Sequence, residues 1–97
     1  MNIPYEHLKM IIKIAEKKSV TAAAVDMNLS QPALSRKLND TERLLGVVLF
    51  QRHGRGVELT GIGQVFCDHA ANIIEQYDSI QSSIGEITGQ FCGSVRI

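Results

Sequence analysis

The stretch from Thr21 to Glu42 limits the possible folds most strongly. It contains three consecutive alanines, is interrupted at Asn28-Leu29-Ser30, and resumes with Pro32. Asn readily adopts the left-handed conformation that closes a helix. Ser30 is a good N-cap residue, and a proline in the first turn of a helix loses no hydrogen bond. The sequence therefore predicts two helices, at about residues 22–27 and 31–45, joined by a tight turn, with Gly46 ending the second.

The second of these helices has one apolar side and one polar side. Its apolar stripe is Leu34, Leu38, Thr41 and Leu45, at steps of four, three and four. At 100° per residue, the residues within about 50° of the opposite side are Pro32, Arg36, Asn39 and Arg43, with Ser35 on the flank. We expect an outward face that is neutral to basic and rich in hydrogen-bonding groups.

A helix precedes this pair, at about residues 5–18. Its predicted core stripe consists of Leu8, Ile11, Ile12 and Ala15. Ser19 and Thr21 are both suitable N-caps for the short alanine-rich helix that follows.

A β-hairpin is predicted next. Two β-prone runs, Val47–Arg52 and Val57–Thr60, flank the turn sequence HGRG, in which two glycines bracket Arg55. The hairpin would form a wing with a basic tip.

A long helix follows from Thr60. Its apolar residues recur every seven positions in two series, Phe66, Ile73, Ile80, Ile87 and Ala70, Tyr77, Ile84, Phe91. At 1.5 Å per residue such a helix is roughly 40 Å long, so it projects beyond a small domain. Its apolar seam would be exposed in a monomer, which predicts a partner helix.

Composition narrows the class of protein. The 97 residues contain no apolar run close to the ~20 residues that span a bilayer and no recognisable signal peptide, which favours a soluble, cytoplasmic protein without membrane partners. Zero net charge hides an asymmetry: residues 1–60 carry nine Lys/Arg and six Asp/Glu, whereas residues 61–97 carry one Arg and four acids. This pattern favours a polyanion-facing front and a rear with another role.

Catalytic and metal sites are not expected. Cys67 and Cys92 form no CxxC motif, and Cys67 and His69 would point about 200° apart on a helix. Both cysteines are expected to be free thiols. The sequence contains no arrangement of nucleophile and base, and its glycines lack the strand–GxGxxG–helix context of a nucleotide-binding loop.

Residues 19–63 resemble the DNA-binding domain of LysR-type transcriptional regulators. The resemblance rests on five linked elements, Ser19-x-Thr21-x-Ala23-Ala24, Ser30-Gln31-Pro32-Ala33-Leu34-Ser35, Glu42-x-x-Leu45-Gly46, Leu49-Phe50-x-Arg52 and Leu59-Thr60-x-x-Gly63. Two positions depart from the usual pattern, Thr41 where the family has Leu and Ile62 where it has Ala. Neither lies on the predicted polar face.

The resemblance implies a mainly α fold, a winged helix-turn-helix in which three helices and a two-stranded wing precede a long dimerisation helix. It divides the chain into a DNA-binding domain (residues 1–60), a linker helix (61–90) and the start of a connection to an effector-binding domain (91–97). It implies double-stranded operator DNA as partner, no cofactor in these residues, and a small-molecule effector bound by the C-terminal domain that this chain lacks.

Contact residues are expected from the docking of such folds, in which the start of the second helix of the pair enters the major groove. Base contacts are expected from Gln31, Pro32, Ser35 and Arg36, and a minor-groove contact from Arg55. The candidate backbone contacts are Thr21, Ser30, Lys37, Arg43, Arg52 and His53. The nucleoid would be the location of the bound protein.

By the same resemblance, two chains pair through antiparallel long helices on an interrupted inverted repeat, and full-length chains form tetramers. The dimerisation residues are expected to be Phe66, Ala70, Ile73, Tyr77, Ile80 and Ile84. A second hypothesis from another class remains open, in which the winged fold is a protein-interaction module.

Overall fold

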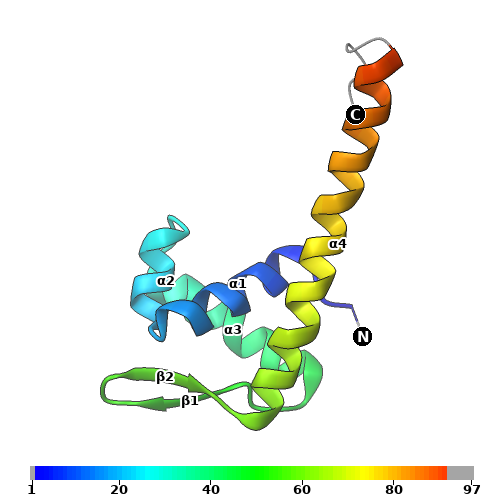
Figure 1. Cartoon of the computed structure of the whole chain (residues 1–97). Helices are drawn as coiled ribbons and strands as arrows, with labels where there is room; N and C mark the ends of the chain where they lie inside the picture. The colour runs from blue at the N-terminus through cyan, green and yellow to red at the C-terminus, as the bar shows by residue number, and fades with distance from the viewer. Residues whose placement is uncertain (1, 92–97) are drawn as a thin grey trace.

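The computed structural model describes residues 2–91, with side chains described to residue 87. Its elements follow the order α1 (Tyr5–Lys17), α2 (Val20–Asp26), α3 (Gln31–Leu45), β1 (Phe50–His53), β2 (Gly56–Leu59) and α4 (Gly61–Phe91). Three helices and the hairpin form a compact head, and α4 rises from its base and projects far beyond it (Figure 1). The predicted mainly α architecture with a two-stranded wing and a long final helix is confirmed. Phe91 as a seam residue, Cys92 and the predicted connection at 91–97 fall outside the described side chains or residues.

Helix α1 packs against α2, α3 and α4, and its buried residues differ from those predicted. Met10, Ile11 and Ile14 are fully buried, whereas Leu8 and Ile12 are only half-buried. Of the expected stripe, Ile11 is confirmed as a core residue, and Ala15 is partly buried against the core. The stripe was misplaced because α1 packs against α2, α3 and α4 at once, and a single face of a helix cannot serve three neighbours.

The junction between α1 and α2 is fixed by the backbone. Lys18 adopts a left-handed conformation with φ 57°, and its amide donates to the Ile14 carbonyl at 2.8 Å. Ser19 Oγ then accepts from the Ala22 amide at 3.0 Å and caps α2. Thr21 lies exposed inside the first turn of α2, so its predicted capping role is wrong. The helix begins at Val20, two residues earlier than expected.

The turn between α2 and α3 follows the predicted chemistry. Asn28 is left-handed, with φ 58°, and the Leu29 amide donates to the Ala24 carbonyl at 2.9 Å. Ser30 Oγ accepts from the Ala33 amide at 3.2 Å, which confirms it as the N-cap of α3. A left-handed Gly46 ends the helix as predicted.

Two side chains fasten the hairpin to the helices. Glu42 Oε2 accepts from the amides of Leu49 at 2.7 Å and Phe50 at 3.2 Å, where the loop enters β1. Thr60 Oγ1 donates to the Val48 carbonyl at 2.7 Å and accepts from the Gly63 amide at 2.9 Å. The end of α3, the start of β1 and the start of α4 are therefore held together at one point.

Gly63 brings α4 close to this point. A Cβ on Gly63 would lie 3.0 Å from the Leu49 carbonyl carbon and 2.9 Å from Leu59 Cδ2, and still closer to the Leu49 carbonyl oxygen. Only a glycine allows the helix backbone to approach β1 this closely. Higher up, the rings of Tyr77 and Tyr5 stack with their centroids 4.2 Å apart, which fixes the direction of α4 against α1.

Candidate nucleic-acid interface

The outer face of α3 is open, as the periodicity predicted. Leu34, Leu38 and Thr41 are fully buried on its inner side. The residues that are exposed on the outer side and flanks are Gln31, Pro32, Arg36, Lys37, Asn39, Asp40 and Arg43, while Ser35 is half-buried. All four predicted base-contact residues therefore lie in the first two turns of one accessible helix.

The start of α3 carries a preformed polar pair. Gln31 Nε2 donates to Ser35 Oγ at 2.7 Å, one turn along the helix. The amide oxygen of Gln31 and its second N–H remain available, so the pair can donate and accept at once. Arg36 follows directly, and within the described chain its guanidinium has no hydrogen-bond or ion-pair partner. An unengaged guanidinium can bind two acceptors on one base edge.

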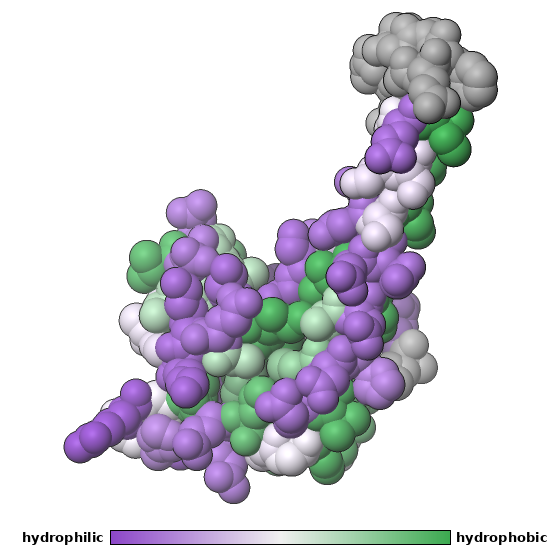
Figure 2. All heavy atoms as spheres, viewed as in Figure 1, coloured by the Kyte–Doolittle hydropathy of each residue, from purple (hydrophilic) through white to green (hydrophobic). Residues whose placement is uncertain are grey.

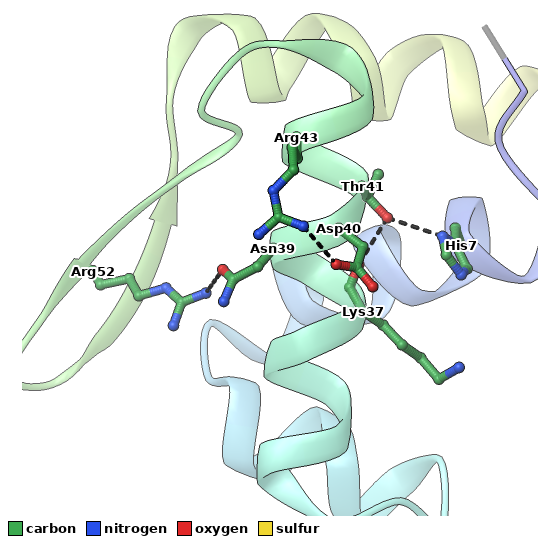
Figure 3. A network of polar contacts seen from close by, with 7 residues as sticks. All are labelled: His7, Lys37, Asn39, Asp40, Thr41, Arg43 and Arg52. Atoms are coloured by element: carbon green, nitrogen blue, oxygen red, sulfur yellow. Dashed lines mark hydrogen bonds and ion pairs between the residues drawn. The ribbon is translucent and has the colours of Figure 1, made fainter.

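Further along α3, two predicted backbone contacts have protein partners (Figure 3). Arg43 Nη1 forms an ion pair with Asp40 Oδ1 at 3.0 Å, which offsets part of its charge. Arg52, from β1, donates through Nη2 to Asn39 Oδ1 at 3.1 Å. Arg52 therefore links the wing to α3.

Lys37 extends from another side of α3. In Figure 3 it points away from Arg52 and toward the side on which His7 lies. Lys37 also borders a surface recess formed with Pro4, Glu6 and Met27. The predicted backbone-contact residues therefore lie on both flanks of α3.

The wing is short and its tip is basic. Its strands pair antiparallel from Phe50↔Leu59 to His53↔Gly56. The Arg55 amide donates to His53 Nδ1 at 3.4 Å, so His53 is engaged with the turn, while Arg55 is exposed. Gly56 has φ 142°, a backbone region essentially restricted to glycine.

Gly56 also brings the wing against the end of α1. A Cβ there would clash with the Lys18 carbonyl oxygen, which accepts from the Val57 amide at 3.1 Å. The wing is thereby tied to the α1–α2 junction as well as to α3.

A polar recess of about 330 Å³ lies between the wing, the start of α2 and the start of α3. The predicted contact residues among its lining are Thr21, Gln31, Arg52, His53 and Arg55. Residues more than thirty positions apart in the sequence thus meet at one surface. Two arginines with neutral donors beside them, and no carboxylate in the lining, make this surface suited to a polyanion.

Sequence reasoning missed the residues that hold this surface together. Glu42 and Gly63 belong to the quoted motifs, but their roles as an anchor for β1 and as a close contact of α4 required the fold. Asn39 was placed on the outer face without its partner Arg52, because the two are distant in sequence. No local pattern identifies such cross-element contacts.

Thr41, where the resemblance led us to expect Leu, makes a buried polar contact. Its hydroxyl donates to the Lys37 carbonyl at 2.9 Å and lies 3.0 Å from His7 Nδ1. The Thr41 hydroxyl and the His7 ring therefore both have hydrogen-bonding partners. The exchange therefore leaves no orphaned polar atom, and it lies on the side of α3 that faces α1.

The α4 seam divides into a covered and an open part. Ala70 is buried and Phe66 is half-buried against the chain's own core. Ile73, Tyr77, Ile80 and Ile84 are exposed.

Cys67 is a half-buried free thiol whose pKa is raised by burial and then by the nearby Asp68. Among the described residues there is no group of three His, Cys, Asp or Glu that could hold a metal, and no helix able to cross a membrane.

Residues 5–64 match the family model for bacterial regulatory helix-turn-helix proteins of the lysR family. The chain belongs to the lysR family. One curated relative is the HTH-type transcriptional regulator GbpR of Azospirillum brasilense. It is 36% identical to this chain over 91 residues, which cover 94% of this chain and 27% of GbpR. PcaQ of Agrobacterium fabrum (strain C58 / ATCC 33970), another HTH-type transcriptional regulator, is 32% identical over 95 residues, covering 98% of this chain and 30% of PcaQ. The chain thus spans less than a third of the length of these relatives, which are regulators and not enzymes.

Solved structures of the same family share the arrangement. The DNA-binding domain of CbnR, crystallised as a DNA complex, has a TM-score of 0.83 and 34% identity, covering 89% of this chain and 99% of that one. The BenM DNA-binding domain in complex with benA site 1 DNA has a TM-score of 0.85 and 30% identity. The match covers 89% of this chain and 97% of the BenM chain. Vibrio fischeri DarR, also in complex with DNA, has a TM-score of 0.83 and 29% identity. The match covers 93% of this chain and 31% of the DarR chain.

Proposed function

We propose that this chain binds double-stranded DNA in a sequence-specific manner, as the DNA-binding part of a LysR-type transcriptional regulator. The observation that carries the proposal is the meeting of the α3 start, the α2 start and the basic wing at one polar surface. The similarity to domains crystallised with DNA supports it. Residues 1–60 act as the DNA-binding head, 61–90 as the dimerisation helix, and 91–97 lead toward an effector-binding domain.

The first two turns of α3 enter the major groove. The Gln31–Ser35 pair contacts one base edge, with the Gln amide suited to adenine, and Pro32 contacts a thymine methyl group. The Arg36 guanidinium donates to the two hydrogen-bond acceptors on the major-groove edge of guanine. Arg55 enters the adjacent minor groove from the wing tip.

Phosphate contacts fix the position of the head on the duplex. On one side they come from the wing and the start of α2, through Thr21, Arg52 and His53, with Ser30 at the α3 N-terminus. Lys37 and Arg43 reach the phosphates beside α3. Arg52 also donates to Asn39 of α3, so the same side chain links the wing to the helix.

Two chains bind together through their α4 helices, so that the site is an interrupted inverted repeat. The open face of Ile73, Tyr77, Ile80 and Ile84 supports this pairing. A longer chain carrying the C-terminal domain would bind a small effector and form tetramers in the cytoplasm, at the nucleoid.

The experiment is a fluorescence anisotropy titration of a mixed-sequence duplex with chain 1–97 at several salt concentrations. We expect affinity to fall with salt at a log–log slope of about −0.9 for each phosphate neutralised. The matched variant is Lys37→Gln, which removes the charge of one proposed phosphate contact and should make the slope shallower by about one unit. Absence of duplex binding at low salt would support the protein-interaction module instead.

A further inference from the structure

The upper part of α4 projects away from the head (Figure 1). Above Tyr77, the side chains described on this helix, those of residues 78–87, are all exposed. Figure 2 shows hydrophobic side chains continuing along one edge of this exposed part. The direction in which α4 leaves the head is therefore set by the contacts that the helix makes up to residue 77.

These contacts are close at the base of α4 and looser farther up. Thr60 and Gly63 hold the first turn against the start of β1. Ala70 is buried, but it presents only a methyl group to the head. Ile74, one turn later, is half-buried and borders a surface groove of about 410 Å³ that is otherwise lined mainly by α1. The two helices therefore leave room beside Ile74 into which α4 could tilt.

An aromatic stack joins the two helices beyond Ile74. The rings of Tyr5 on α1 and Tyr77 on α4 have centroids 4.2 Å apart and planes that differ by 23°. Lys9, one turn along α1, places its ammonium 5.5 Å from the centroid of the Tyr5 ring. A cation and an aromatic ring attract each other at this distance, which favours the orientation that Tyr5 has in the stack. The stack is therefore a second fixed point for α4, well above its base.

Two fixed points on a helix determine its angle to the head. Gly63 and Tyr77 are 14 positions apart, or roughly 21 Å along the helix axis. Closing a gap equal to the ring separation of 4.2 Å over that length would tilt α4 by about 11°. The two shorter extents of the molecule are 25 and 20 Å, so this tilt moves the far side of a head by about 4–5 Å. That displacement exceeds one base-pair step, which is about 3.4 Å.

We infer that Tyr5 is a positioning residue that selects the gap between the two halves of the inverted repeat. This inference rests on the proposed function, in which paired chains place two heads on one duplex. Through its stack on Tyr77, Tyr5 fixes the tilt of α4 on each head, and the two tilts fix the separation of the two α3 helices. At any other gap, the stack must open in at least one head. An aromatic pair contributes a factor of about 2–10, so the best gap should be preferred over its neighbours by that factor or more.

The test is selection of chain 1–97 against randomised duplexes, with the gap read from the enriched sequences. Tyr5→Ala removes the ring, whereas Tyr5→Phe keeps the ring and is the conservative variant. Tyr5 belongs to α1, so neither substitution changes the α4 face proposed for pairing. Ile14→Val is the matched control for stability, because Ile14 is fully buried and loses one methylene group. We expect Tyr5→Ala to reduce the preference for the best gap about 2–10-fold, while Tyr5→Phe and Ile14→Val retain it.

The tilt itself is measured without DNA. Pulsed electron paramagnetic resonance gives the distance between spin labels on the exposed positions Lys17→Cys in α1 and Ser82→Cys in α4, in a chain carrying Cys67→Ala and Cys92→Ser. Dilution with a large excess of unlabelled chain leaves only distances within one chain. Ser82 lies roughly 28 Å above the base of α4, so a tilt of about 11° moves it by about 5–6 Å. Tyr5→Ala should shift or broaden the distance distribution by about this amount, and Tyr5→Phe should leave it unchanged.

Either of two results would overturn the inference, namely an unchanged gap in the sites enriched by Tyr5→Ala or an unchanged distance distribution in that variant. A gap that also changed in Ile14→Val would overturn it, because the gap would then follow stability and not the stack. If Tyr5→Ala enriched no sequence, the distance distribution would decide. A folded, unsubstituted chain that enriched no sequence would overturn the proposed function together with this inference.

Discussion

Replacing Glu42 with alanine should weaken the attachment of β1 to α3 and destabilise the head. In the folded chain, one carboxylate oxygen accepts from two backbone amides, those of Leu49 and Phe50. Both residues are buried, with at most 3% of their surface exposed. Alanine removes the acceptor and offers nothing in its place.

The cost follows from the number of amides left without a partner. A buried donor that loses its acceptor costs about 1–3 kcal/mol, and hydrogen bonds to a charged group lie toward the upper end. Two amides that are partly rehydrated at the edge of the head give a total of about 3 kcal/mol. At 4–8 °C per kcal/mol for a domain of this size, the melting temperature should fall by about 12–24 °C.

The assay is thermal unfolding followed by circular dichroism at one fixed protein concentration, because association contributes to apparent stability. Glu42→Gln keeps one carbonyl oxygen as an acceptor and loses only the charge, so its cost should be about 1 kcal/mol. Glu58→Ala is the matched control, since Glu58 is exposed on β2 and its removal should change stability by less than about 0.5 kcal/mol.

The order of stability of the three variants tests whether Glu42 anchors β1. We expect Glu42→Ala to be the least stable, then Glu42→Gln, then Glu58→Ala. If Glu42→Ala melted within a few degrees of Glu58→Ala, the Glu42 carboxylate would not anchor β1 through the amides of Leu49 and Phe50.

Three further predictions concern other parts of the head. Gly63→Ala should destabilise the chain by about 1–3 kcal/mol in urea unfolding, because its Cβ meets backbone that Glu42 and Thr60 hold in place; an unchanged midpoint would contradict this. Arg36→Ala should weaken operator binding by about 1–3 kcal/mol and relax preference at one base pair, while Lys37→Ala weakens all sequences alike; equal, sequence-blind losses in anisotropy titrations would refute the assignment of Arg36. Asp26 has a lowered pKa because Lys13 donates to it at 2.9 Å and adds its charge, so the stability it contributes is present above the unfolded-state pKa near 4 and is lost as pH falls through the folded-state value. Asp26→Asn should remove that acid-side loss from a pH series of melting temperatures, and an identical pH profile would contradict it.

Local chemistry made the helix-turn-helix predictable. The caps at Ser30 and Gly46, the proline in the first turn and the left-handed Asn28 all act within a few residues of where they stand. The polar face of α3 followed from the same helix by periodicity alone. These features could be inferred from the sequence because no other part of the chain changes them.

The remaining features depend on which elements meet. The core face of α1 was misplaced because three neighbours surround it, and Ile14 is buried by contacts that its own helix does not encode. The hydrogen bond from Arg52 to Asn39, thirteen residues away, was not predicted, because it joins two separate elements. The seven-residue repeat predicted the long helix but could not separate Ala70, which packs inside the chain, from Ile80, which remains exposed. The repeat identifies apolar positions on one side of the helix. Only the fold shows which of these side chains are buried within the same chain.

The most direct test of the central claim is selection of chain 1–97 against a pool of randomised duplexes, followed by sequencing of the bound fraction. The polar face of α3 predicts enrichment of two short half-sites in inverted orientation, separated by a fixed gap. It also predicts that Arg36→Ala loses the preference at one position of each half-site. A pool that emerges without any enriched sequence, from a protein that is folded by circular dichroism, would contradict the proposal that this surface recognises DNA sequence.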